Sequence, residues 1–361
     1  MMILSLVWME TSTTHYLLGT AATFLLLAAG LLLFVLYFLQ KQHRRARTKK
    51  HLRLLYSDLI SEMSLCESES EREEVWARPS TEKIKKTWLT QSFGRKILIK
   101  ELVKSKDSLT GDAATNLRWL YEKLALDKDS FQRFSSKAWH IKASGIQQLA
   151  EMQQAQYLIK IYRETNNRNA FVRSEAQIAV VKLTGFKGLR FLNIVSYPIT
   201  QWQQLCLLDQ LREQDVEPEK IQGWLLSKND TVVEFALRLT AAFKCYALHP
   251  AVNDCLQHSS PVIREQALLA LQEIYSEDTT PILLNIFPSC TKTEQWLVIK
   301  ILLNNADKNG IRLLLSLLAQ QNEEMQQFAR LAVQEHHPDL LNNPGKEKEV
   351  VFPSSLHKKA I

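Results

Sequence analysis

A short helical phrase recurs along this chain at a nearly constant interval, and that interval constrains the fold more than any other feature. The phrase is an apolar residue followed, four positions later, by a small one. Its clear occurrences are Val172/Ala176, Val232/Ala236, Ile263/Ala267 and Met325/Ala329. Its weaker occurrences are Trp139/Ala143, Trp202/Cys206 and Glu294/Val298. The first members are separated by 33, 30, 30, 31, 31 and 31 residues, a regularity that predicts a repeat protein.

A second pair of residues precedes each phrase at a constant distance. In the last six repeats its members stand eleven and seven residues before the phrase. They are Ile161/Thr165, Phe191/Val195, Ile221/Leu225, Val252/Leu256, Leu283/Phe287 and Leu314/Leu318. A separation of four keeps both members on one helical face. Each repeat is therefore predicted to be two helices, and the repeats to stack as an all-α solenoid in which each pair buries its face against its neighbours.

Two of the second helices resemble those of HEAT repeats, particularly the short bacterial kind. They read FVRSEAQIAV (171–180) and PVIREQALLAL (261–271), and Arg173 and Arg264 stand where such repeats favour arginine. The other repeats depart from the pattern with His140, Gln203, Val233, Gln295 and Gln326. The period is also shorter than the roughly 40–47 residues typical of HEAT repeats. The resemblance covers about 139–337 and implies a HEAT-like α–α superhelix.

An apolar run at 16–39 predicts one transmembrane helix. No Asp, Glu, Lys or Arg occurs between Glu10 and Lys41. At 1.5 Å per residue the run is long enough to cross a hydrocarbon core of about 30 Å. A cleavable signal peptide has a positive start, a shorter apolar run and a small-residue cleavage site, which this segment lacks. We therefore expect a permanent anchor that also contacts membrane lipid.

The charge on either side of this run predicts its orientation. No basic residue precedes it, and seven follow it: Lys41, Arg44, Arg45, Arg47, Lys49, Lys50 and Arg53. Basic residues near a span stay on the cytoplasmic side. We therefore expect a single-pass protein of the inner (cytoplasmic) membrane, with residues 1–15 outside and the body in the cytoplasm. The simplest function of the basic run is to fix the orientation of the span. We also expect it to contact anionic lipid headgroups.

The same run accounts for the basic character of the chain. The net charge of +7 divides as −1 for 1–40, +7 for 41–53 and +1 for 54–361. A body that binds nucleic acid needs a basic face of its own. A nucleic-acid-binding solenoid is therefore the least favoured function, and no nucleic-acid partner is expected.

Composition shifts divide the rest of the chain. The acidic stretch ESESERE and Pro79 predict a mobile or partly helical stalk, and helices are expected over 80–106 and 112–126. A first repeat needs a dedicated cover, so these helices are expected to cap the solenoid. The expected segments are a basic juxtamembrane segment and stalk (40–79), a helical cap (80–138), HEAT-like repeats (139–337) and a disordered tail (338–361).

One group of side chains has metal-ligand chemistry. Cys and His are zinc ligands, and Cys245, His249, Cys255 and His258 lie within one short stretch. Their spacing matches no standard zinc finger, and the repeat register places Cys255 on a buried helix face, where a free cysteine is commonly found. We therefore expect no metal site. The odd number of scattered cysteines, five, also favours reduced thiols in the cytoplasm over disulfides.

Neither a GxxxxGK[ST] loop nor a GxGxxG occurs in the sequence, and no nucleophile motif is apparent. We therefore expect no enzymatic activity and no cofactor. Short HEAT-like repeats do occur in some lyases, including those that attach bilins, so a lyase-type enzyme remains the alternative from a different class. An apolar stripe lies five positions into the second helices: Leu207, Leu237, Leu268 and Ile299. It could be a face on which a partner helix docks, or it could pack against the next repeat, and packing is favoured.

The whole chain resembles a group of membrane-anchored HEAT-repeat proteins of Bacteroidetes-type bacteria. The likeness rests on the N-terminal span, the segment from GRKILIKEL to DKDSFQRF (94–134), and WHIKASGIQQLAEM (139–152). It implies an accessory role in cell-surface polysaccharide synthesis, and a membrane glycosyltransferase or another membrane protein as partner. It supplies no catalytic residues. The predicted function is a membrane-anchored cytoplasmic scaffold or adaptor that works by protein–protein interaction.

The orientation is directly testable. We expect a fluorescent protein fused to the C-terminus to be active in the cytoplasm, because all seven flanking positive charges follow the span. Alkaline phosphatase fused at the same place, which is active only in the periplasm, should stay inactive. The reverse pattern of activity would contradict the orientation.

Overall fold

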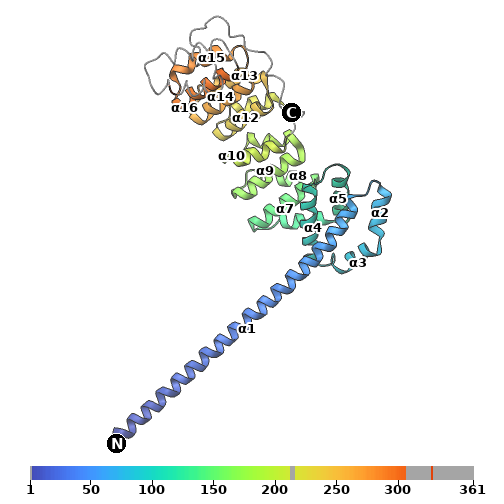
Figure 1. The fold of residues 1–361 in the computed structure, drawn as a ribbon, viewed down its shortest axis with the longest axis vertical. Helices are drawn as coiled ribbons and strands as arrows, with labels where there is room; N and C mark the ends of the chain where they lie inside the picture. The colour runs from blue at the N-terminus through green and yellow to red at the C-terminus, as the bar shows by residue number, and fades with distance from the viewer. Residues whose placement is uncertain (1, 212–215, 306–326, 328–361) are drawn as a thin grey trace. The chain divides into compact units, whose positions relative to one another are not determined.

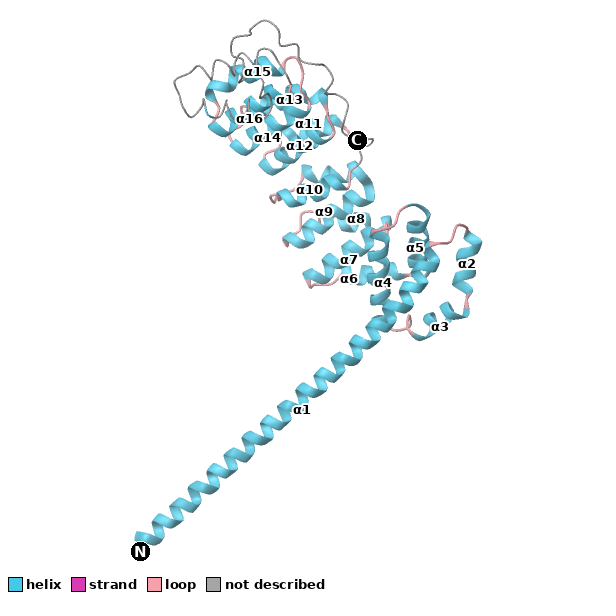
Figure 2. Cartoon of the chain, in the orientation of Figure 1, coloured by secondary structure: helices cyan, strands magenta, loops and turns pink. Residues whose placement is uncertain are grey.

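The structure is a computed structural model that describes residues 2–211, 216–305 and 327. All regular structure in these residues is helical, with sixteen α-helices, short 3-10 segments and no strand (Figure 2). The all-α fold class is thereby confirmed for the described part of the chain. The chain divides into two compact units, residues 1–135 and 136–361, which we call unit 1 and unit 2 (Figure 1).

Unit 1 begins with the helix α1 (Met2–Ser64), which contains the apolar run and the basic run without interruption. Its 63 residues correspond to about 95 Å of helix. The part from Thr23 onward includes an exposed stretch of mean hydropathy 2.3, long and apolar enough to cross a membrane. Phe24, Leu27 and Phe34 are among its exposed side chains. Figure 1 shows the N-terminal part of α1 clear of the other helices of unit 1.

The expected stalk at 54–79 is instead part of a folded core. The last turns of α1 pack against α4 and α5. They bury one stripe of α1 side chains, namely Leu52, Tyr56, Leu59, Ile60 and Met63. The acidic stretch begins α2 (Glu69–Ala77), whose first turn carries Glu69 and Glu71. Carboxylates are favourable there because the N-terminal end of a helix is positive. The acidic composition thus marks a helix start, and the helical spacing of the apolar residues decides the packing.

The helix expected over 80–106 is two helices, α3 (Pro79–Thr87) and α4 (Ser92–Asp107). The chain turns between them, and a Cβ atom on Gly94 would lie 2.2 Å from the carbonyl oxygen of Trp88. Only glycine permits this close approach. The remaining helices of unit 1 are α5 (Gly111–Lys123), close to the expected 112–126, and α6 (Leu126–Phe134).

Unit 2 contains long helices that pack on one another and shorter helices that pack beside them. The long ones are α7 (Trp139–Glu151), α9 (Ala170–Thr184), α10 (Gln201–Asp209), α12 (Asp230–Ala242), α14 (Pro261–Glu273) and α16 (Lys292–Asn304). The short ones are α8 (Leu158–Tyr162), α11 (Pro218–Leu225), α13 (His249–Cys255) and α15 (Thr279–Ile286). Among them α7 contacts α9, α9 contacts α10, α12 contacts α14, and α14 contacts α16. Each long helix in these pairs is the second helix expected for one repeat.

The short helices α8, α11 and α13 each pack on the long helix that follows. The expected pairs of all five first helices that the structure describes are buried: Ile161/Thr165, Phe191/Val195, Ile221/Leu225, Val252/Leu256 and Leu283/Phe287. One first helix differs from expectation, because Phe191 lies in a 3-10 helix, Gly185–Asn193. Leu314/Leu318 and the tail at 338–361 lie outside the described residues.

An N-cap residue with a polar side chain begins five of the second helices at a nearly constant interval. These caps are Asn169, Thr200, Asn229, Ser260 and Thr291, separated by 31, 29, 31 and 31 residues. Four of the five accept a hydrogen bond from a backbone N–H in the first turn. The third residue after each cap is buried, namely Val172, Gln203, Val232, Ile263 and Glu294. The start of each helix and its buried side therefore stand in a constant register.

This register corrects two of the weaker phrases. Trp202 is 75% exposed and Trp139 is 46% exposed, so neither occupies a core position. In α10 the cap at Thr200 places Gln203 inside, where its amide donates to Oε1 of the buried Gln177. Trp202 is the more apolar of the two neighbours, yet it lies outside and Gln203 inside. The helix start, and not the most apolar side chain, decides the phase.

The predicted repeat-core residues that the structure describes are all buried: Val172, Ala176, Val232, Ala236, Ile263 and Ala267. Met325 and Ala329 lie outside the described residues. The apolar stripe Leu207, Leu237, Leu268 and Ile299 is buried as well. Because these side chains are buried, they contribute to packing and are not available as a docking face.

Enlarging a buried alanine tests this register. Ala236→Leu and Ala267→Leu should each lower the free energy of unfolding by about 1–3 kcal/mol, because both sites are fully buried and the added atoms overpack the core. Ala242→Leu is the matched control, since Ala242 is exposed on the same helix as Ala236. Chemical denaturation of the purified protein measures all three. Equal stability of Ala236→Leu and Ala242→Leu would contradict the register.

Candidate docking groove on the second helices

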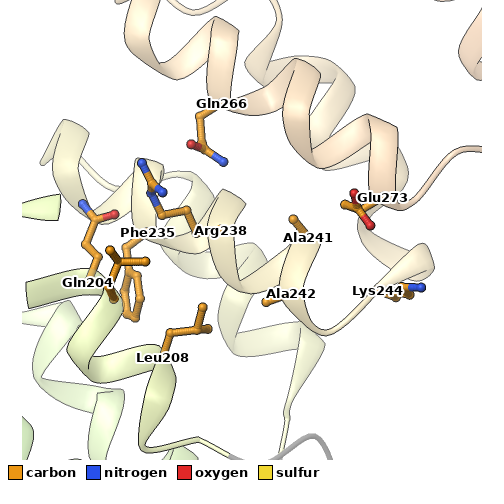
Figure 3. Close-up of a pocket in the computed structure, with 10 residues that line it drawn as sticks. Gln204, Leu208, Phe235, Arg238, Ala241, Ala242, Lys244, Gln266 and Glu273 are labelled. Atoms are coloured by element: carbon orange, nitrogen blue, oxygen red, sulfur yellow. The ribbon is translucent and has the colours of Figure 1, made fainter. Parts of the chain in front are cut away.

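A groove of about 340 Å³ crosses three second helices of unit 2 (Figure 3). Helices α10, α12 and α14 each contribute side chains to it. The lining residues are Gln204, Leu205, Leu208, Phe235, Arg238, Ala241, Ala242, Lys244, Gln266 and Glu273. It lies wholly within unit 2, on three helices that were each expected to be the second helix of a repeat.

The floor of the groove is apolar. Phe235 is fully buried in α12, while Leu205 on α10 is half exposed. Ala241 and Ala242 continue this surface along α12 toward Lys244. Their short side chains leave the room that longer ones would fill. The groove can thus take an apolar side chain from outside, as most binding sites do.

Gln204 places a buried amide at one end of this floor. The residue is 1% exposed, and its Nε2 donates to the carbonyl oxygens of Ile199 and Thr231 at 3.3 and 3.4 Å. These bonds identify the other amide atom as oxygen. That Oε1 is buried and has no hydrogen-bond partner among the described residues. An unpaired buried acceptor costs about 1–3 kcal/mol, so its presence calls for a physical reason.

Arg238 lies at the same end, with its head group near that of Gln204 (Figure 3). It forms an ion pair with Glu234, one turn earlier on α12, with 2.9 Å between its terminal nitrogen and the Glu234 Oε1. The Nε of Arg238 is buried and, in the described part of the chain, makes no hydrogen bond. A buried donor and a buried acceptor therefore both lack partners in one groove.

Gln266 adds a third polar group from α14. Its side chain points from above into the groove (Figure 3). The residue is only 9% exposed, and its amide forms no hydrogen bond with any described residue. At the far end Lys244 and Glu273 carry opposite charges. With Glu234 balancing Arg238, the groove has no net charge.

A second pocket, of about 330 Å³, is built differently. Its charged groups already bind one another: Arg264 Nε lies 2.7 Å from Glu294 Oε1 and the same guanidinium donates to the carbonyl of His258. Burial raises the pKa of the Cys290 thiol to about 11, so the thiol is protonated and weakly nucleophilic at neutral pH. The charged groups of this pocket are thus already paired within the protein.

The two arginines that carried the sequence resemblance, Arg173 and Arg264, form the same kind of hydrogen bonds in their two helices. Arg173 donates to the carbonyl oxygens of Asn167 and Arg168, six and five residues earlier. Arg264 donates to those of His258 and Ser259, again six and five residues earlier. Both arginines therefore satisfy the free carbonyls of the turn before their helix. Their position in the sequence pattern has a physical purpose in both repeats.

The basic run lies on the exposed surface of α1. Lys41, Arg44, Arg45, Arg47, Lys49 and Lys50 are exposed. Arg53 differs, because its Nε lies 2.9 Å from Glu101 Oε1 on α4. The run is therefore free over most of its length and is tied to the body of unit 1 at its end.

The structure separates the side chains of the metal-like group. His249 Nε2 lies 2.7 Å from Thr279 Oγ1, and Cys255 bonds through Sγ to the carbonyl of Ala251. His258 Nδ1 accepts from the backbone N–H of Ser260. Among the described residues no three His, Cys, Asp or Glu side chains gather in a way that could hold a metal ion.

The groove residues were not found from the sequence. Gln204, Arg238 and Gln266 belong to three different repeats and have no shared motif. Two of them, Gln204 and Gln266, are polar side chains on buried or nearly buried helix faces. A search for glutamines inside the apolar stripes of second helices would have pointed toward them.

Comparison with known proteins adds little. No known protein-family model matches the sequence, and no curated protein matches it. Among solved structures, the crystal structure of an engineered protein, a Northeast Structural Genomics Consortium target, shares 13% sequence identity over 80% of this chain and 95% of its own, with a TM-score of 0.32. A likeness at this level does not establish a common arrangement of helices.

The buried histidine predicts a pH dependence of stability. Burial lowers the pKa of His249, against the opposing charge of Asp278. The folded protein then holds His249 neutral where the unfolded chain takes up a proton. Its contribution is fully present above the usual histidine pKa of about 6.5 and is lost as the pH falls through the folded pKa. We expect the melting temperature to fall less between pH 7 and pH 5 in His249→Gln than in the parent. Parallel curves would contradict this assignment.

Proposed function

We propose that this protein is a membrane-anchored cytoplasmic scaffold whose HEAT-like solenoid binds another protein in the groove of α10, α12 and α14. The observation that carries the proposal is the groove itself: an apolar floor beside two buried polar atoms, Gln204 Oε1 and Arg238 Nε, that lack hydrogen-bond partners within the described chain. A buried polar atom without a partner calls for a physical reason, and a bound protein that completes the groove is the reason proposed here.

The long apolar helix supports an anchor. An exposed apolar stretch of this length is costly in water and favourable in a bilayer. The charge asymmetry around it supports the orientation with the body in the cytoplasm. The resemblance to membrane-anchored HEAT-repeat proteins of Bacteroidetes-type bacteria favours the inner membrane, and a membrane glycosyltransferase or other membrane protein of polysaccharide synthesis as partner.

The anchor is joined to unit 1 by helix and not by a flexible linker. Between Leu39 and the first buried residue, Leu52, α1 continues without a break. Thirteen residues of helix hold these points about 20 Å apart. A tether of fixed length raises the local concentration of a weakly binding protein near partners in the same membrane, without any new contact.

The alternatives receive less support. A lyase-type enzyme needs an acid or a base that is free to act on a substrate, whereas the charged groups of the second pocket bind each other and Arg238 of the groove is paired with Glu234. A nucleic-acid-binding solenoid needs a basic face, whereas 54–361 carries a net charge of only +1. Protein docking asks only for the apolar floor and the unpaired polar groups.

A charge placed in the groove tests this function. In the full chain, Ala241→Arg should abolish complementation of a deletion strain at native expression, because a long cation fills the apolar floor. The half-buried site tolerates the change, so the melting temperature should stay close to that of the parent. Leu226→Arg is the matched control, since Leu226 is 83% exposed and lies outside the groove.

The tether is tested in the same strain. Replacing 16–39 by an unrelated span of the same orientation should restore function, whereas a chain starting at Lys41 should not. That shorter chain keeps Leu52 and the rest of the unit 1 core. Full complementation by Ala241→Arg would overturn the docking function, and full complementation by the anchorless chain would overturn the tether.

A further inference from the structure

Six exposed cations follow the apolar stretch on the same unbroken helix. We call them the basic collar: Lys41, Arg44, Arg45, Arg47, Lys49 and Lys50. No Asp or Glu occurs between Glu10 and Asp58 to balance their charge. Among the described residues, the ion pairs of α1 involve Arg53 and Glu62 and none of the six. The collar therefore carries charge that this part of the chain leaves uncompensated.

The height of the collar above the apolar stretch matches the place of lipid headgroups. Along the helix, Lys41 lies about 3 Å past Leu39, Arg45 about 9 Å and Lys50 about 16 Å. The headgroup layer of one leaflet is about 5–8 Å thick. Beyond that layer, charge still acts across about 8 Å at physiological salt. With Leu39 at the end of the span, the whole collar is within reach of the lipid phosphates.

The cations surround the helix and do not share one face. A spacing of four residues places three of them on one side: Lys41, Arg45 and Lys49. A spacing of three places the others on the opposite side, about 160° away: Arg44, Arg47 and Lys50. A helix that lies flat on a membrane, or that docks a protein or nucleic acid, presents its charge on one side. Lipid surrounds a spanning helix on all sides, so the lipid headgroups fit this distribution best.

We propose that the basic collar binds a shell of anionic lipid headgroups around α1 in the cytoplasmic leaflet. Each cation attracts a headgroup of net negative charge, such as that of phosphatidylglycerol, over a zwitterionic one. The shell holds α1 at a set height in the bilayer, and with it the core of unit 1, which begins at the buried Leu52. The inference rests on the membrane anchor proposed above and names the class of lipid that the anchor recruits.

The test counts the lipids that the full chain holds. The protein is reconstituted in nanodiscs of phosphatidylcholine with a minor share of phosphatidylglycerol. Native mass spectrometry of the released protein then counts the molecules of each lipid that stay bound. We expect phosphatidylglycerol to be enriched about fivefold over its share of the disc, the factor that corresponds to about 1 kcal/mol for a cation near a membrane surface.

Two triple variants divide the collar by side, and each should remove about half of the excess phosphatidylglycerol. They are Lys41→Gln/Arg45→Gln/Lys49→Gln and Arg44→Gln/Arg47→Gln/Lys50→Gln. The matched control removes three exposed lysines of the same spacing from α4, namely Lys96→Gln/Lys100→Gln/Lys104→Gln. Helix α4 packs on α1 beyond the collar, where Glu101 pairs with Arg53, so this control should keep the full excess. All the changed side chains are exposed, and the fold should be retained.

Three results would overturn the inference. The absence of enrichment in the parent would leave the basic run with orientation as its function. Loss of the excess in one triple variant and not in the other would indicate a partner docked on one side of α1. An equal loss in the α4 control would mean that net charge, and not the collar, attracts the lipid. These failures are distinct from failure of the anchor, because a chain that does not enter the nanodiscs at all overturns the anchor as well.

Discussion

Capping hydrogen bonds at the start of four second helices fix where those helices begin, and the pattern of burial in unit 2 follows the same register. Asn169, Thr200, Asn229 and Thr291 accept a backbone N–H in the first turn of their helices. Each cap contributes only about 1 kcal/mol. Its larger effect is geometric, because the residue that begins the helix decides which side chains, a fixed number of residues later, face the core.

The groove is a consequence of that phase. Because Thr200 begins α10, Gln203 and Gln204 are buried while Trp202 is left outside. Had Trp202 been inside, as its hydrophobicity suggests, the Gln204 amide would have been turned from its place beside α12. The ion pair between Arg238 and Glu234 adds little stability of its own, since it is partly exposed. The ion pair holds the Arg238 guanidinium at the groove and compensates its charge.

In unit 1 the basic run lies on one continuous helix, between the apolar stretch and the folded core. The helix that carries the apolar stretch is the same helix that buries Tyr56 and Met63 in the core of unit 1. A helix of this length bends gently and rarely breaks without proline or glycine, and none of either lies between Leu39 and Ser64. The body therefore begins at a set distance from the apolar stretch, with the basic side chains on the helix between them.

Local pattern was sufficient for the all-α class, the paired helices near each period and the buried alanines at 236 and 267, because helical spacing and burial depend on neighbouring residues. It failed where distant contacts compete with composition. The acidic stretch after α1 looked like a stalk, yet its apolar neighbours pack on α4 and α5. The groove was beyond local pattern, because Gln204, Arg238 and Gln266 come from three helices and line one groove only when those helices pack. An unpaired hydrogen-bonding atom is a property of the packed chain, since in the unfolded chain water satisfies every one.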